Sequence, residues 1–153
     1  MRNRNEIPAE LKWDFTHIFK TKEDWEKAYS EVENEISALS ALKGTLGESA
    51  DLLAKAYDTL FGFYEKFEPV ADYAFLKKTI DGGDSEAQAM GDRVNMLAVK
   101  ASSAAAFFDP ELMEIPEEKL AEFMKYDKMK KYAHIVEDAT RLRAHVLDEK
   151  SEG

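Results

Sequence analysis

The stretch "TKEDWEKAYSEVENEISAL", residues 21–39, decides the fold class. Its apolar side chains recur every three or four positions: Trp25, Tyr29, Val32, Ile36 and Leu39. This spacing places them on one face of an α-helix. Thr21 and Asp24 form a weak variant of the capping box, a signal for the start of a helix. The pattern predicts a helix over about residues 22–42.

The same spacing resumes after "KGTLGES", a segment whose two glycines break the first helix. A second helix is predicted from its apolar residues: Leu52, Leu53, Ala56, Tyr57, Leu60, Phe61 and Tyr64. Pro69 has no N–H to donate and disfavours helical backbone at Glu68. We therefore expect the helix to kink or split there, with a third helix ending near Ile80.

Two capping signals predict the helices that follow. Ser85 with Gln88 forms a capping box for a long helix over residues 86–108. Asp127 is suited to cap a last helix. That helix would carry a single apolar stripe of Met129, Tyr132, Ile135, Val136, Ala139 and Leu142.

The stretch "FFDPELMEIPEEKL", residues 107–120, lies between these two long helices. Pro116 suits the first turn of a helix, and Glu117 and Glu118 would lie at the positive end of its dipole. We expect a turn followed by a short helix.

These segments predict an all-α domain of five to seven antiparallel helices. Residues 1–20 lack helical periodicity but contain Trp13, Phe15, Ile18 and Phe19, so we expect an extended strap that docks on the helices. The helical domain would span residues 21–147, and residues 148–153 would form a tail.

Composition limits the partners and the compartment. The chain has 21 basic and 31 acidic residues and a formal charge of -10, which disfavours nucleic acids and anionic membranes. It has no cysteine, which excludes disulfides and thiol chemistry and favours the cytoplasm. The longest run of apolar or small residues, Ala101 to Phe108, is too short to span a bilayer, and we expect no secretion signal.

The three histidines provide a full test for imidazole chemistry. His134 and Glu137 form an H-x-x-E pair, but Asp138 follows where an inverted zinc-peptidase motif needs a second histidine. Zinc usually takes three or four protein ligands, and His17 and His145 are far apart in sequence. We predict no metal site.

Adjacent carboxylates are abundant but point in different directions along a helix. The pairs are Glu117 with Glu118, Glu137 with Asp138, and Glu23 with Asp24. They are more typical of solvated helix faces than of acid–base pairs. We predict no catalytic, cofactor-binding or metal-ligating residue, and no cofactor, in this chain.

Four ordered segments resemble the N-terminal region of oligoendopeptidase F, a zinc metallopeptidase related to thimet oligopeptidase. They are "EIPAELKWDFTHIF", "YAFLKKTIDGGDSEAQAM", "FFDPELMEIPEEKL" and "RLRAHVL". The resemblance extends from about residue 6 to residue 147 and keeps the order and rough spacing of the segments.

The resemblance implies an all-helical enzyme that cleaves short oligopeptides in a deep channel. Its zinc would be held by the histidines of an H-E-x-x-H motif and a downstream glutamate, in a catalytic domain beyond this region. The sequence contains no H-E-x-x-H and stops at "DEKSEG". We therefore expect a channel wall that is inactive alone, whose partners are the catalytic domain and, through it, oligopeptides. The alternative is a stand-alone helical interaction module.

Four aromatic residues nearly encircle one end of the second predicted helix: Phe61, Phe63, Tyr64 and Phe67. Rings spread around a helix cannot all face one small core. They predict either an exposed docking patch, with self-association of the isolated domain, or a central helix surrounded by others.

Overall fold

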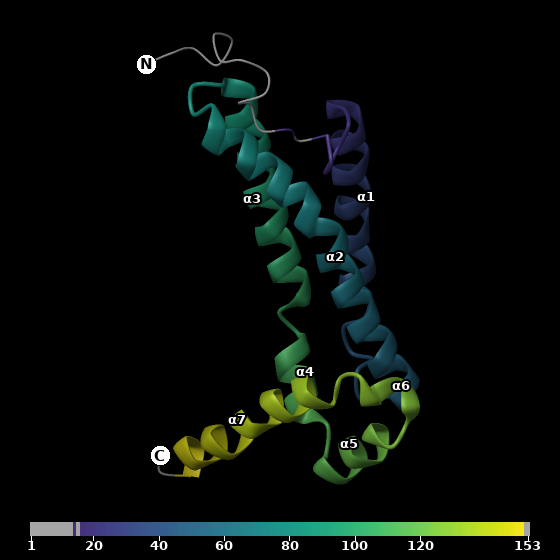
Figure 1. Cartoon of the computed structure of the whole chain (residues 1–153). Helices are drawn as coiled ribbons and strands as arrows, with labels where there is room; N and C mark the ends of the chain where they lie inside the picture. The colour runs from purple at the N-terminus through teal and green to yellow at the C-terminus, as the bar shows by residue number, and fades with distance from the viewer. Residues whose placement is uncertain (1–13, 15, 152–153) are drawn as a thin grey trace. The chain divides into compact units, whose positions relative to one another are not determined.

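A computed structural model describes residues 14 and 16–151 of the chain, and these residues form seven helices and no strand. The helices, drawn in Figure 1, are α1 (Lys22–Ser40), α2 (Ala50–Ile80), α3 (Ser85–Ala105), α4 (Phe108–Glu114), α5 (Glu117–Met124), α6 (Asp127–Lys130) and α7 (Ala133–Ser151). The predicted all-α class and helix number are confirmed. Most of the predicted strap, residues 1–13 and 15, lies outside the described residues.

The chain divides into two compact units. The first comprises Met1–Glu35 and Phe63–Lys100, and the second comprises Ile36–Gly62 and Ala101–Gly153. Each unit is therefore built from two separate stretches of sequence. None of the helices in the described part of the chain is long and apolar enough to cross a membrane.

The first unit contains parts of α1, α2 and α3, whose course Figure 1 shows. A buried tryptophan of α1 lies in its core. The side chain of Trp25 is fully buried, and its indole N–H donates a hydrogen bond of 2.9 Å to the carbonyl oxygen of Val70. A buried N–H without an acceptor would cost about 1–3 kcal/mol, so this bond fixes how α1 meets α2. Val94 and Leu97 bring α3 into the same core.

Arg93 sets the register between α1 and α3. Its two terminal nitrogens donate to the two carboxylate oxygens of Glu26 at 2.7 and 2.8 Å. Its guanidinium carbon lies 4.2 Å from the ring centre of Tyr29, whose hydroxyl donates to the Arg93 carbonyl at 3.2 Å. The hydrogen bonds from Arg93 lower the pKa of Glu26. This paired and stacked arginine is a strong, geometrically specific contact.

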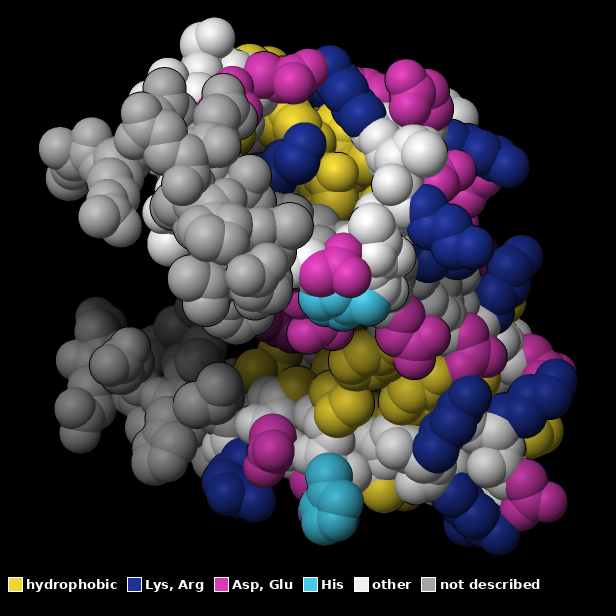
Figure 2. All heavy atoms as spheres, turned by 45° about the horizontal axis from the view of Figure 1, so that its top comes forward, with side chains coloured by type: hydrophobic (Ala, Val, Ile, Leu, Met, Phe, Trp, Pro, Cys, Tyr) yellow, Lys and Arg dark blue, Asp and Glu magenta, His cyan; other side chains and the backbone are white. Residues whose placement is uncertain are grey.

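Further ion pairs follow the outside of the first unit. Lys100 pairs with Glu33 at 3.0 Å, and Lys66 and Lys22 pair with Glu35 and Glu86. Figure 2 shows basic and acidic side chains interleaved on the face that it presents. Exposed pairs contribute about 0–1 kcal/mol each, so the apolar core rather than these pairs stabilises the unit.

The second unit surrounds a stack of tyrosines. The Tyr57 ring from α2 stacks on Tyr132 at 4.9 Å between centres and meets the edge of Phe108 at 5.8 Å. Burial raises the pKa of Tyr57 to about 12. Tyr132 lies between α6 and α7 and donates its hydroxyl hydrogen to Asp58. The turn between α6 and α7 therefore places an aromatic ring in the core.

Two predicted helix starts have different outcomes. The Thr21 and Asp24 capping box is confirmed: the Asp24 N–H donates to Thr21 Oγ1 at 3.1 Å, and the Thr21 N–H donates to Asp24 Oδ2 at 3.2 Å. The box predicted at Ser85 and Gln88 is wrong. α3 begins at Ser85, and Asp84 caps it by accepting the Glu86 N–H at 2.8 Å, because a carboxylate one residue earlier takes the cap position.

The predicted split at Pro69 is wrong, because α2 is one helix of 31 residues through the proline. Pro69 cannot donate to the carbonyl of Glu65 in the i to i−4 ladder. Glu65 is exposed, so water can reach that part of the helix. Phe63 and Val70 are buried on either side of the proline, and their packing holds the helical backbone together.

Two other helix predictions are corrected. The long helix predicted over residues 86–108 ends at Ala105, and the turn predicted after it is α4, with Pro110 in its first turn. The last predicted helix is divided into α6 and α7. Ile135 is 38% exposed, whereas Met129 and Val136 are buried, so the predicted apolar stripe is not buried as a whole. Backbone of the predicted tail, residues 148–151, continues α7.

The aromatic residues near the middle of α2 have different environments. Phe63 is buried and Phe67 is half-buried in the first unit, where Tyr64 is 46% exposed. Phe61, in the second unit, is 37% exposed and stacks on Tyr132 at 5.7 Å. Part of the set is core and part is surface, and a single docking patch stays a prediction.

Replacing Thr21 with alanine tests the cap of α1. Thr21→Ala removes an acceptor for an N–H that has no helical partner, and we expect a loss of about 1 kcal/mol in the free energy of unfolding in urea. Thr79→Ala is the matched control, because Thr79 Oγ1 bonds to the Phe75 carbonyl within α2 and caps nothing. Equal effects of the two substitutions would contradict the capping role.

Replacing Pro69 with alanine tests the cost of the proline inside α2. Pro69→Ala restores the missing donor, and we expect it to raise the free energy of unfolding by roughly 1–3 kcal/mol. Pro110→Ala, in the first turn of α4 where the N–H has no helical partner, should change stability little. Thermal and urea unfolding measure both, and a destabilised Pro69→Ala variant would show that the proline fits its site without strain.

Candidate functional site

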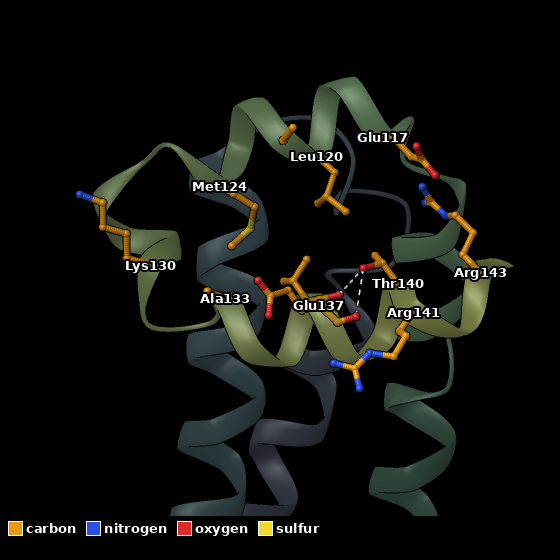
Figure 3. Close-up of a pocket in the computed structure, with 11 residues that line it drawn as sticks. Glu117, Leu120, Met124, Lys130, Ala133, Glu137, Thr140, Arg141 and Arg143 are labelled. Atoms are coloured by element: carbon orange, nitrogen blue, oxygen red, sulfur yellow. Dashed lines mark hydrogen bonds between the residues drawn. The ribbon is translucent and has the colours of Figure 1, made fainter.

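The second unit contains a groove between α5 and α7 (Figure 3). Its volume is about 630 Å³, within the range of ligand pockets. The residues that line it are Glu117, Leu120, Ala121, Met124, Lys130, Ala133, Val136, Glu137, Thr140, Arg141 and Arg143. Apolar side chains form its floor, and charged side chains of both signs form its edges.

Arg143 closes one end of this groove and fixes α7 to α4. Its Nη2 donates to the carbonyl oxygens of Leu112, Met113 and Ile115 at 3.1, 2.5 and 2.7 Å. The last carbonyls of a helix have no partner within the helix and carry partial negative charge. A guanidinium is thus suited to the end of α4, which has only seven residues.

One polar atom of Arg143 has no hydrogen-bond partner among the described residues. Its Nε is buried and makes no hydrogen bond to the described residues. In Figure 3 the side chains of Arg143 and Glu117 point toward one another at this end of the groove. Buried donors are nearly always paired in folded proteins, so this nitrogen marks a position for an acceptor.

Two basic side chains at the groove, Lys130 and Arg141, have local partners. Lys130 pairs with Asp127 at 2.6 Å, and Arg141 pairs with Asp138 at 3.3 Å. The Thr140 hydroxyl donates to the carbonyl oxygens of Val136 and Glu137 along α7. These contacts are exposed or internal to a helix, so none of them resembles an acid–base pair.

Two of the three histidine side chains, His17 and His134, lie in the described part of the structure. The His134 side chain is 99% exposed, and its Nδ1 lies 3.9 Å from Glu137 Oε2. His17 is exposed, and the side chain of His145 lies outside the described residues. No group of three histidine, aspartate or glutamate side chains that could hold a metal ion occurs among the residues described. The donor set does not fit zinc, which takes at least three protein ligands.

The carboxylate pairs singled out in the sequence lie on surfaces. Glu117, Glu118, Glu137 and Asp138 are exposed, and Asp24 belongs to the cap of α1. A lowered carboxyl pKa occurs elsewhere in the second unit: hydrogen bonds from Lys131 and Tyr132 lower the pKa of Asp58. This shift has a structural cause, an ion pair between α2 and the turn before α7.

Sequence patterns did not reveal the role of Arg143. It lies in "RLRAHVL", two residues after an exposed arginine of the same helix. Its acceptors are backbone carbonyls, which have no sequence signature. The groove also depends on how far α5 and α7 diverge, a tertiary property that the spacing of apolar residues does not encode.

Comparisons with known proteins agree with the helical fold. The family model described as oligopeptidase F matches residues 111–153, the region of α4 to α7. The oligopeptidase PepF of Bacillus subtilis is 36% identical over 98% of this chain, and the chain covers 22% of that protein. The plasmid-encoded oligoendopeptidase F of Lactococcus lactis is 31% identical over 99% of the chain, which covers 26% of it.

A solved structure of an oligoendopeptidase F is similar to this chain as well. The crystal structure of oligoendopeptidase-F from Enterococcus faecium superposes with a TM-score of 0.72 at 28% identity, over 82% of this chain and 25% of that one. The chain thus spans about a quarter of the length of the relatives that it matches.

The fold is an all-helical domain, and the comparisons show that it is similar to one part of longer oligopeptidase F proteins. The resemblance predicted from the four sequence segments is confirmed. The chain is homologous along nearly its whole length to the N-terminal domain of oligopeptidase F.

Replacing Arg143 tests its role at the end of α4. Arg143→Met keeps much of the apolar stem but leaves three carbonyls without their donor, and we expect a loss of about 2 kcal/mol in the free energy of unfolding. Arg141→Met, the same change at an exposed ion pair two residues earlier, should stay within about 0.5 kcal/mol of the parent chain. Urea unfolding measures both, and equal losses would show that Arg143 is not a cap.

Proposed function

We propose that this chain serves as the non-catalytic N-terminal domain of an oligoendopeptidase F-like zinc metalloendopeptidase. In that enzyme it would form one wall of the channel in which short oligopeptides are hydrolysed. Zinc, the catalytic residues and the contacts to substrate would belong to a catalytic domain of the same polypeptide. The single observation that carries the proposal is the match over 98% of this chain to a relative of which it covers only 22%.

The chemistry of the described residues supports a scaffold role. The H-x-x-E pair of His134 and Glu137 is exposed and has no third ligand. The pKa shifts of Glu26 and Asp58 arise from ion pairs that join helices. We include in the proposal the division into a strap, a helical domain over residues 21–147 and a connection to the catalytic domain. The absence of cysteine supports the cytoplasm as its location.

One observation favours a second candidate, a stand-alone interaction module. In the first unit four large apolar side chains are exposed: Tyr64 at 46%, Phe75 at 41%, Met96 at 61% and Val99 at 66%. Exposed apolar side chains can serve binding to another protein. The reading frame after Gly153 separates the candidates, because an H-E-x-x-H downstream supports the peptidase and a stop codon supports the module.

Zinc binding and peptide cleavage test the division of labour. After treatment with a chelator, we expect the 153-residue chain to show no stoichiometric zinc binding in calorimetry and no cleavage of a quenched fluorescent peptide. The longer polypeptide of the same reading frame should do both. Submicromolar zinc binding by the short chain that disappears in His134→Ala would overturn the scaffold role.

A further inference from the structure

The groove between α5 and α7 has the chemistry of a binding site for a helix. Leu120 and Val136 form a floor of tightly packed apolar side chains, and half-buried Met124 adds a flexible one. Exposed Glu117 and Glu137 are among the charged side chains at its edges. An apolar floor between charged edges complements an amphipathic helix, which buries one apolar stripe and keeps polar residues at the sides.

Arg143 adds a polar anchor at one end of the groove. Its Nη2 donates to two carbonyls of α4 and to that of Ile115, the residue after α4, whereas its buried Nε makes no hydrogen bond to the described residues. The guanidinium places a positive charge at this end of the groove, so the two ends of the groove differ in chemistry.

The relatives indicate where the occupant comes from. The family model matches residues 111–153, the same region that forms the groove. The relatives continue for about three quarters of their length outside the part that this chain covers. We infer that the groove between α5 and α7 receives an amphipathic helix from the remainder of the same oligopeptidase F-like polypeptide. This inference rests on the proposed function and names the surface through which the domain joins the rest.

Single cysteines can report on the groove, because the chain has none of its own. Ala121→Cys places a thiol in the groove on exposed backbone of α5, where it should not disturb folding. Glu122→Cys, the next residue on α5 and also exposed but not a groove residue, is the matched control. Labelling with a maleimide, followed by peptide mass spectrometry, gives the rate at each position in the short chain and in the longer polypeptide.

We expect Cys labelling in the Ala121→Cys variant to be at least about tenfold slower in the longer polypeptide than in the short chain, with the Glu122→Cys rate unchanged. Equal rates at both positions in the two proteins would overturn the groove proposal and leave the proposed function intact. A reading frame that stops at Gly153 would overturn both. If labelling of the Ala121→Cys thiol in the short chain slows as the protein concentration rises, the occupant of the groove is a second copy of the chain. That result would also overturn the groove proposal.

Discussion

The hydrogen bonds from Arg143 to the last carbonyls of α4 are the contact on which the second unit depends. α4 to α6 have seven, eight and four residues, lengths at which an isolated helix is not stable in water. They persist because tertiary contacts satisfy their ends and bury one face. Arg143 does this for α4 from a helix about 30 residues later, and Leu112 and Ile115 beside it enter the core. The same side chain holds the middle of α7 against the end of α4 and lines the groove.

The first unit meets the same requirement through different chemistry. Its helices are long, so their ends matter less than their register. Trp25 and Arg93 fix that register, one through an indole N–H in the core and the other through a paired and stacked guanidinium. These contacts are specific in geometry, whereas the surface pairs of Lys22 and Lys100 are worth little individually. A scaffold that holds a partner in place benefits from such fixed geometry.

Sequence patterns predicted the features that are local. The start of α1 at Thr21, the break at the glycines before α2 and the end of α2 at Ile80 follow from spacing, capping and breaker residues. Tertiary packing decided the rest: buried side chains on both sides of Pro69 keep α2 continuous, and Tyr132 packing on Tyr57 divides the last helix. Asp84 rather than its neighbour Ser85 caps α3. Both are good capping residues, and sequence spacing alone does not predict which of them takes the position. The resemblance identified the relatives, but no pattern located the groove or the role of Arg143.

Each unit is formed by two separate stretches of sequence, so the ribosome finishes the residues of one unit before those of the other. All residues of the first unit have been made once Lys100 leaves the ribosome. Leu53 and Tyr57 of the second unit are made earlier, yet the core that covers them needs Met129, Tyr132 and Val136. Their apolar side chains therefore stay without their core partners while more than half of the chain is translated. The region matched by the family model therefore completes a core that was begun long before it, and cannot form that core from its own residues.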